Sequence, residues 1–189
     1  MKSKGRRGKG SSREAKKKPG AKQSKPRPEA SGRAKPYTFL EHPADVGFLA
    51  RGHTLTELFE SAAAAVLDYG WELDTVRERD QVNLRARAAT LEDLLFSWLA
   101  ELVYLADAEH WVFKRVHVRQ LVPNVRDAPP PYEGAPAQKP AWEVRGAAFG
   151  ERFDKARHRA RTYIKAVTYH QLAVEESPDG WQATVFLDV

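Results

Sequence analysis

Apolar residues recur every three or four positions along residues 55–67, the spacing that gives a helix one apolar face. Thr54, with Glu57 three residues later, forms a capping box in front of this run. Gly70 follows it, and glycine is common where helices stop. The pattern predicts a helix that starts after Thr54 and lies with its apolar face on a sheet.

A second run with the same spacing covers residues 91–106. Thr90 precedes it as a helix cap, and Asp93 places a negative charge in the first turn, where the helix dipole favours it. Trp98 belongs to the apolar stripe, so we expect it in the core rather than at a ligand. This run predicts a second helix with an apolar face and a polar back.

The remaining apolar segments alternate with polar residues or are rich in β-branched and aromatic residues, as strands are. They predict strands at residues 37–40, 46–51, 82–86, 112–122, 142–149, 162–174 and 181–188, with a turn at 178–180. Residues 123–141 contain six prolines and are predicted to form a surface loop of low order. Together the elements predict an α+β layered domain, with two amphipathic helices packed on one face of a mainly antiparallel sheet.

The charge is divided unevenly along the chain. Residues 1–36 hold 14 of the 31 Lys and Arg and two acids, a net charge of +12, whereas residues 37–189 carry −6. The first segment contains no Val, Ile, Leu, Phe, Tyr or Trp, so burial cannot offset the entropy of ordering it. We therefore predict a disordered basic tail, 1–36, and one folded domain, 37–189.

Such a tail attracts polyanions through counterion release. RNA is the favoured partner and an anionic membrane surface a distant second. The alternative is a solubilising extension that has no dedicated partner.

Several classes of protein are excluded by what the sequence lacks. There is no cysteine, which excludes disulfides and thiolate metal sites. No apolar run reaches the length of a membrane helix, and the N-terminus lacks the apolar core of a signal peptide, so we predict a soluble, cytoplasmic protein. Gly-rich phosphate loops, Gly-x-Ser-x-Gly, His-Glu-x-x-His and the dinucleotide fingerprint are also missing, which removes the commonest enzyme classes.

Three polar clusters remain as candidates for chemistry. His42 and Asp45 lie in a turn that contains a rigid Pro and a permissive Gly, a composition that fixes the backbone and presents side chains. Residues 150–158 are dense in charge directly after a predicted strand. Lys165 stands in an otherwise apolar and aromatic strand segment, 165–170, although a lysine there can also reach out to water.

Asp188 is a fourth candidate, one residue before the end of the sequence. Its carboxylate and the terminal carboxylate of Val189 would concentrate hard oxygen ligands, which suit Ca²⁺ or Mg²⁺ better than zinc. The alternative is an exposed, frayed chain end. The residues alone leave both interpretations open.

Taken together, these clusters and helices resemble the archease family. The family's motifs occur in order: the aromatic-led strand ending in Ala-Asp-Val-Gly at 37–47, the Leu-Phe-Glu-x-Ala helix at 52–62, the leucine-rich Trp-Leu helix at 94–105, Gly-Glu…Asp…His at 150–158, Lys-Ala-x-Thr-Tyr-His at 165–170 and the Asp-containing end at 187–189. The chain departs from the pattern at Pro43, where Thr is commoner, and in its longer Pro-rich segment and basic tail.

The resemblance implies a protein cofactor rather than an enzyme. Archeases activate the RtcB-type tRNA-splicing RNA ligase by promoting its guanylylation by GTP, so that the ligase turns over repeatedly. By position, the family's divalent cation (Ca²⁺ or Mg²⁺) would be held by Asp45, Asp188 and Val189, and its functional lysine would be Lys165. Two alternatives are a stand-alone metal-dependent phosphoester enzyme using the same groups, and an RNA–protein assembly chaperone acting through the tail and exposed apolar surface.

Overall fold

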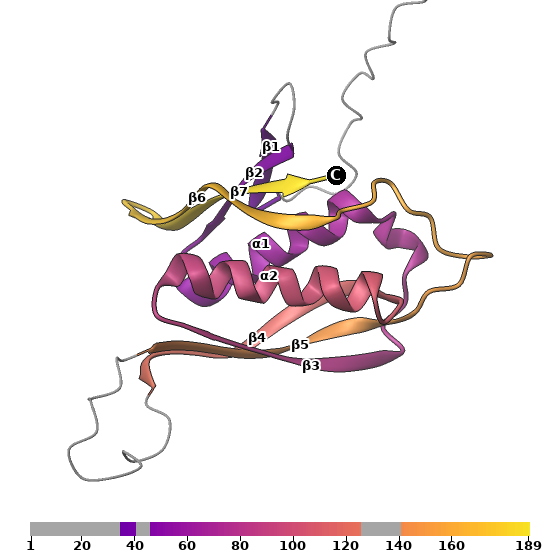
Figure 1. The fold of residues 1–189 in the computed structure, drawn as a ribbon, viewed down its shortest axis with the longest axis horizontal. Helices are drawn as coiled ribbons and strands as arrows, with labels where there is room; N and C mark the ends of the chain where they lie inside the picture. The colour runs from indigo at the N-terminus through magenta and orange to yellow at the C-terminus, as the bar shows by residue number, and fades with distance from the viewer. Residues whose placement is uncertain (1–34, 41–45, 126–140) are drawn as a thin grey trace, which may run out of the picture. The chain divides into compact units, whose positions relative to one another are not determined.

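The structure, a computed structural model, describes residues 35–40, 46–125 and 141–189 (Figure 1). Most of the predicted basic tail, the pair His42 and Asp45, and most of the Pro-rich segment lie outside the described residues.

Two antiparallel sheets enclose two helices (Figure 1). The first sheet has the strand order β1 (Tyr37–Leu40), β2 (Val46–Gly52), β7 (Gly180–Asp188), β6 (Ala166–Ser177). The second has the order β3 (Asp80–Ala88), β5 (Ala141–Arg152), β4 (Trp111–Val125). Between them lie α1 (Leu55–Gly70), which is followed by a short 3-10 helix, η1 (Leu73–Thr75), and α2 (Leu91–Asp107).

Each helix is covered on two sides, which differs from the predicted packing on one face of a sheet. Helix α1 contacts β2 and β4, and α2 contacts β3 and β6, so both helices touch both sheets. The reason lies in the alanines of α1: Ala62, Ala63 and Ala65 are fully buried and widen the packed surface beyond the stripe of larger residues. The α+β class and the two helices are confirmed.

Both predicted helix starts are confirmed. The Thr54 Oγ1 accepts a hydrogen bond from the Glu57 backbone N–H at 3.2 Å, and Thr90 does the same for Asp93 at 3.1 Å. The Glu57 carboxylate bonds back to the N–H of His53 rather than to that of Thr54. Helix α1 ends at Gly70 as predicted, although this glycine does not adopt the left-handed conformation.

The segment predicted as one strand at 162–174 begins later than expected. Strand β6 starts at Ala166, so Lys165 stands just before the strand and not inside it. The reason is that the N–H groups of Arg161 and Thr162 donate to the carbonyl of Gly70, at 2.8 and 3.4 Å. The end of α1 therefore holds this segment away from the sheet.

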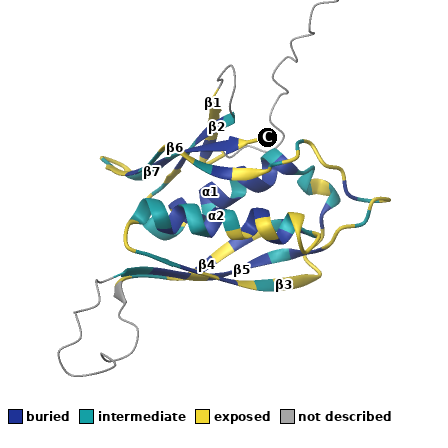
Figure 2. Ribbon diagram, in the orientation of Figure 1, coloured by how far each residue is buried: buried dark blue, intermediate teal, exposed yellow. Residues whose placement is uncertain are grey.

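The core lies where the helices face the two sheets, as the buried positions in Figure 2 show. Trp98 is fully buried, as its place in the apolar stripe predicted. In the described part of the chain, neither helix has the length and hydropathy needed to cross a membrane.

Candidate functional site

Pairing of β6 with β7 brings Lys165 beside Asp188. In this antiparallel pair Ala166 lies opposite Asp188, and one residue earlier the Lys165 N–H donates to the carbonyl of Asp188 at 2.9 Å. Two segments separated by more than twenty residues in the sequence are thereby fixed to each other through their main chains.

The Lys165 side chain extends over the end of β7. Its Nζ donates to the backbone oxygen of Val189 at 2.9 Å and lies 3.6 Å from Oδ1 of Asp188. Both charged side chains are more than half exposed, so water screens their attraction, and such a pair contributes at most about 1 kcal/mol to stability. The cluster is a surface site whose groups are accessible to a partner.

The fourth predicted site residue, Asp45, lies outside the described residues. Val46, which follows it in the chain, pairs with Leu187, the residue before Asp188. Within the described residues, no group of three or more His, Asp or Glu side chains could hold a metal ion. Asp188 and Val189 offer oxygen atoms, the ligand type that Ca²⁺ and Mg²⁺ prefer, so the described donors fit the implied cation.

Other residues of the same motifs have a packing role around Phe186. A Cβ atom at Gly47 would lie 2.8 Å from the Phe186 ring, so only glycine leaves room for this buried side chain. The Thr168 hydroxyl donates to the Phe186 carbonyl at 3.1 Å, and the His170 ring meets the Phe186 ring edge-on. The sequence did not indicate this role, because in a strand Phe186 shares its side with the polar residues Thr184 and Asp188.

The charged cluster at 150–158 is built around a buried carboxylate. Glu151 is 3% exposed and accepts two hydrogen bonds from the Arg157 guanidinium, at 3.0 and 2.8 Å. It also accepts from the Arg77 N–H at 2.9 Å, and Arg79 lies 3.3 Å away. The Arg157 hydrogen bonds outweigh the effect of burial and hold the pKa of Glu151 far below its usual range.

His158 completes this network. Its Nδ1 accepts a hydrogen bond from the Asp154 N–H at 2.9 Å, so the ring proton is on Nε2, which donates to Glu151 at 3.0 Å. Every polar atom of this imidazole thus has a partner inside the protein. We interpret the cluster as a structural network that fixes the turn after β5, because neither Glu151 nor His158 is left to act on a substrate.

The domain that carries these residues is similar to known proteins. A family model described as "Archease protein family (MTH1598/TM1083)" matches residues 37–189, the whole of the predicted domain. The chain belongs to the archease family.

The relatives have similar lengths to the matched domain. The chain is 35% identical over 155 residues to protein archease of Methanosarcina acetivorans, which covers 82% of this chain and 97% of that protein. It is 34% identical over 152 residues to protein archease of Pyrococcus furiosus, covering 79% and 95%. The solution structure of Methanobacterium thermoautotrophicum protein 1598 is similar with a TM-score of 0.65 and 26% identity, over 82% of this chain and 100% of that one.

Proposed function

We propose that this archease-family chain is a protein cofactor that activates an RtcB-type tRNA-splicing RNA ligase. In this proposal the chain promotes guanylylation of the ligase by GTP and so permits multiple turnover. The observation that carries the proposal is the exposed cluster in which the Lys165 ammonium reaches the Val189 oxygen beside the Asp188 carboxylate.

The chemistry of nucleotidyl transfer explains why such a cluster is useful. Charge develops on phosphate oxygens during the transfer, and positive groups fixed nearby stabilise it. A divalent cation held by Asp45, Asp188 and Val189 supplies such charge when bound. Lys165 adds an ammonium group with three donors, held in place by its main-chain bond to β7.

The surface position of the cluster favours an activator over a stand-alone enzyme. Its charged side chains are open to solvent, where a large partner can reach them. The described acid–imidazole pair that lies in the interior, Glu151 and His158, is already saturated by internal hydrogen bonds. A partner protein that brings its own active site is therefore the better match to this arrangement.

The test is multiple-turnover RNA ligation by a purified cognate ligase with GTP, with and without this chain. We expect the chain to raise the number of turnovers, and Asp188→Asn to remove most of that effect together with most of the affinity for Ca²⁺ or Mg²⁺ measured by calorimetry. Asp179→Asn, an exposed acid in the turn before β7, is the matched control and should retain both.

The two alternatives predict different outcomes. A phosphoester enzyme would turn over RNA or nucleotides without any ligase. An assembly chaperone would keep its effect in Asp188→Asn, since it acts through the tail and exposed apolar surface rather than through this carboxylate. Either result would overturn the proposed role of the surface cluster formed by Lys165, Asp188 and Val189.

A further inference from the structure

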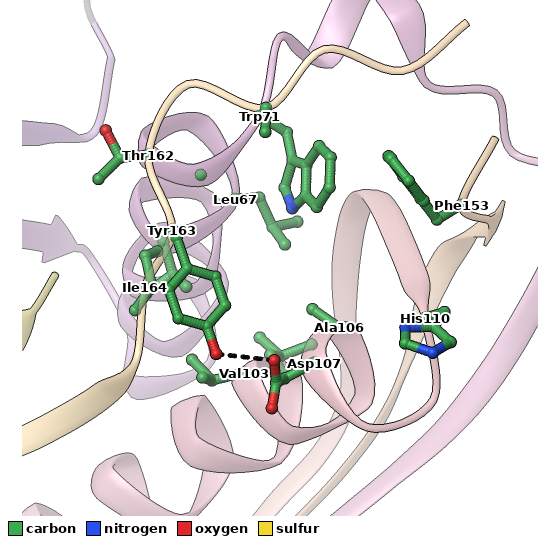
Figure 3. A pocket seen from close by; sticks show the side chains of 14 residues that line it. Leu67, Trp71, Val103, Ala106, Asp107, His110, Phe153, Thr162, Tyr163 and Ile164 are labelled. Atoms are coloured by element: carbon green, nitrogen blue, oxygen red, sulfur yellow. Dashed lines mark hydrogen bonds between the residues drawn. The ribbon is translucent and has the colours of Figure 1, made fainter. Parts of the chain in front are cut away.

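A cavity of about 250 Å³ lies between the ends of α1 and α2 and the segment that leads from β5 to β6 (Figure 3). Much of its lining is apolar and comes from both helices and the segment before Lys165. These apolar residues are Val66, Leu67, Leu102, Val103, Ala106 and Ile164.

Aromatic side chains also line this cavity. Figure 3 shows the rings of Trp71, Phe153, Tyr163 and His110 arranged around one space. The Trp71 and Phe153 ring centroids are 5.6 Å apart, and the two faces are tilted by 50°. Phe153 and Tyr163 are 43% and 61% exposed, so both rings are accessible from solvent.

A carboxylate completes the ring of side chains. Asp107, at the end of α2, accepts a hydrogen bond from the Tyr163 hydroxyl at 2.8 Å. That hydrogen bond raises the pKa of Tyr163, as expected beside a negative charge. None of the described residues that line the cavity is Lys or Arg, so its one firmly charged group is negative.

The walls are held in place by backbone contacts. The His110 carbonyl accepts a hydrogen bond from the Phe153 N–H at 2.8 Å, and Trp71 forms a bridge with Ala160. His110 has a φ of 55°, a left-handed conformation that costs energy for a residue other than glycine. The main-chain contacts of Phe153 and Trp71 therefore fix these walls of the cavity without a ligand.

We propose that this cavity binds a small organic cation, a quaternary or alkylated ammonium group carried on an apolar body. The faces of aromatic rings are electron-rich and attract cations, and cages of such rings recognise choline and methylated lysine in other proteins. In this proposal the apolar lining contacts the methyl groups of the ligand, and the Asp107 carboxylate balances the positive charge of the ligand. The cavity is smaller than the usual pocket for a drug-sized ligand, of roughly 300–1,000 Å³, so a head group fits better than a large molecule.

The same chemistry is carried by a free choline-type molecule and by a methylated lysine side chain of another protein. Calorimetry on the full chain separates them with two pairs of probes. The first pair is choline and its neutral isostere 3,3-dimethylbutan-1-ol. The second is a short peptide with trimethyllysine and the same peptide with unmodified lysine.

We expect at least one cationic probe to bind, and its neutral or unmodified counterpart to bind at least about fivefold more weakly. Trp71→Ala and Asp107→Asn should each weaken binding by about tenfold. Tyr104→Ala removes an aromatic residue of α2 that is 57% exposed and does not line the cavity, so it should leave binding unchanged.

Asp107→Asn keeps the proposal testable if Trp71→Ala fails to fold, because it alters one side chain at the rim.

Tighter binding of choline than of the peptide assigns the site to a free cation, and the reverse assigns it to a protein side chain. Equal binding of choline and its isostere would overturn the proposal and make this an apolar pocket. Absence of binding by both cationic probes would overturn it as well. Neither result would bear on ligase activation.

Discussion

The ammonium group of Lys165 donates a hydrogen bond to the backbone oxygen of Val189, with 2.9 Å between Nζ and the oxygen. The same residue bonds through its backbone N–H to Asp188. One lysine therefore ties the segment before β6 to the end of β7 by both its main chain and its side chain. Its charge is consequently held at a defined place on the surface.

Lys165→Met tests that placement. Methionine keeps most of the apolar stem but removes the charge and the donor, so we expect stimulation of ligase guanylylation to fall at least about tenfold. The free energy of unfolding should change by less than about 1 kcal/mol, because the pair is exposed. Radiolabelled GTP transfer to the ligase measures the first quantity and chemical denaturation the second.

Lys155→Met is the matched control, since Lys155 is an exposed lysine in the turn after β5. It should stimulate guanylylation like the unmodified chain. If Lys165→Met did the same, Lys165 would have no part in activation.

Glu151→Gln tests the structural interpretation of the second cluster. Glutamine is nearly isosteric but removes the buried negative charge that Arg157 and Arg79 face, and it leaves Arg157 with Asp154 as its ion-pair partner. We expect a loss of about 2–4 kcal/mol in the free energy of unfolding, at the lower end of the usual cost of breaking a buried ion pair because Arg157 is partly exposed. Urea denaturation measures this loss.

Glu109→Gln provides the comparison, because Glu109 forms an exposed ion pair with Arg152. It should cost less than about 1 kcal/mol. Equal stabilities of the two variants would contradict the structural role assigned to Glu151. Loss of ligase activation in a stable Glu151→Gln protein would show that the cluster also takes part in function.

The local features of the fold could be predicted from the sequence, whereas the arrangement of its layers could not. Thr54 and Thr90 accept hydrogen bonds from N–H groups three residues away, so the local sequence was sufficient to place both helix starts. The covering of α1 by two sheets depends on which distant strands pair, and apolar periodicity does not specify that.

The same limit applies to the candidate sites. Motif order placed Lys165 and Asp188 in one proposed site, and the structure brings them to 3.6 Å. The density of charge at 150–158 did not reveal that Glu151 is buried and fully paired, because burial arises from residues far away in the sequence. The cavity beside Trp71 and Tyr163 was missed for this reason too, since its rings come from four separate segments.

The free energy of unfolding should decrease as the pH falls into the acidic range. Hydrogen bonds from Arg157 lower the pKa of Glu151, and those from Arg85 lower the pKa of Glu143, relative to the ordinary 4.5. The unfolded chain therefore takes up these protons first as the pH falls. The stabilisation is complete above the unfolded pKa and is lost progressively as the pH falls below about 4.5 toward the folded values.

Urea midpoints measured from pH 7 to pH 3 check this dependence. We expect little change down to about pH 5 and a steep fall below it. In Glu151→Gln the fall should be shallower, since one of the two depressed groups is gone. An identical slope in the variant would contradict the assignment of the acid sensitivity to Glu151.

Removing the basic tail should separate RNA binding from ligase activation. The truncation should begin after residue 33, because the Lys35 ammonium bonds to Asp68 at 2.7 Å and the Pro36 carbonyl accepts from the Arg51 N–H at 2.8 Å. It removes 13 basic and 2 acidic residues. We expect weaker RNA binding at low salt and a smaller dependence of affinity on salt, with stimulation of guanylylation unchanged.

A tail of the same length made of Gly and Ser is the control, because it restores the chain length without the charge. It should behave like the truncated protein when RNA affinity is measured by fluorescence anisotropy across a salt series. If the truncated protein or the Gly-Ser control bound RNA as tightly as the full chain, RNA would not be the partner of the tail. Loss of guanylylation in a purified system would instead make the tail part of activation, since none of the described residues at the β6–β7 end would have been altered.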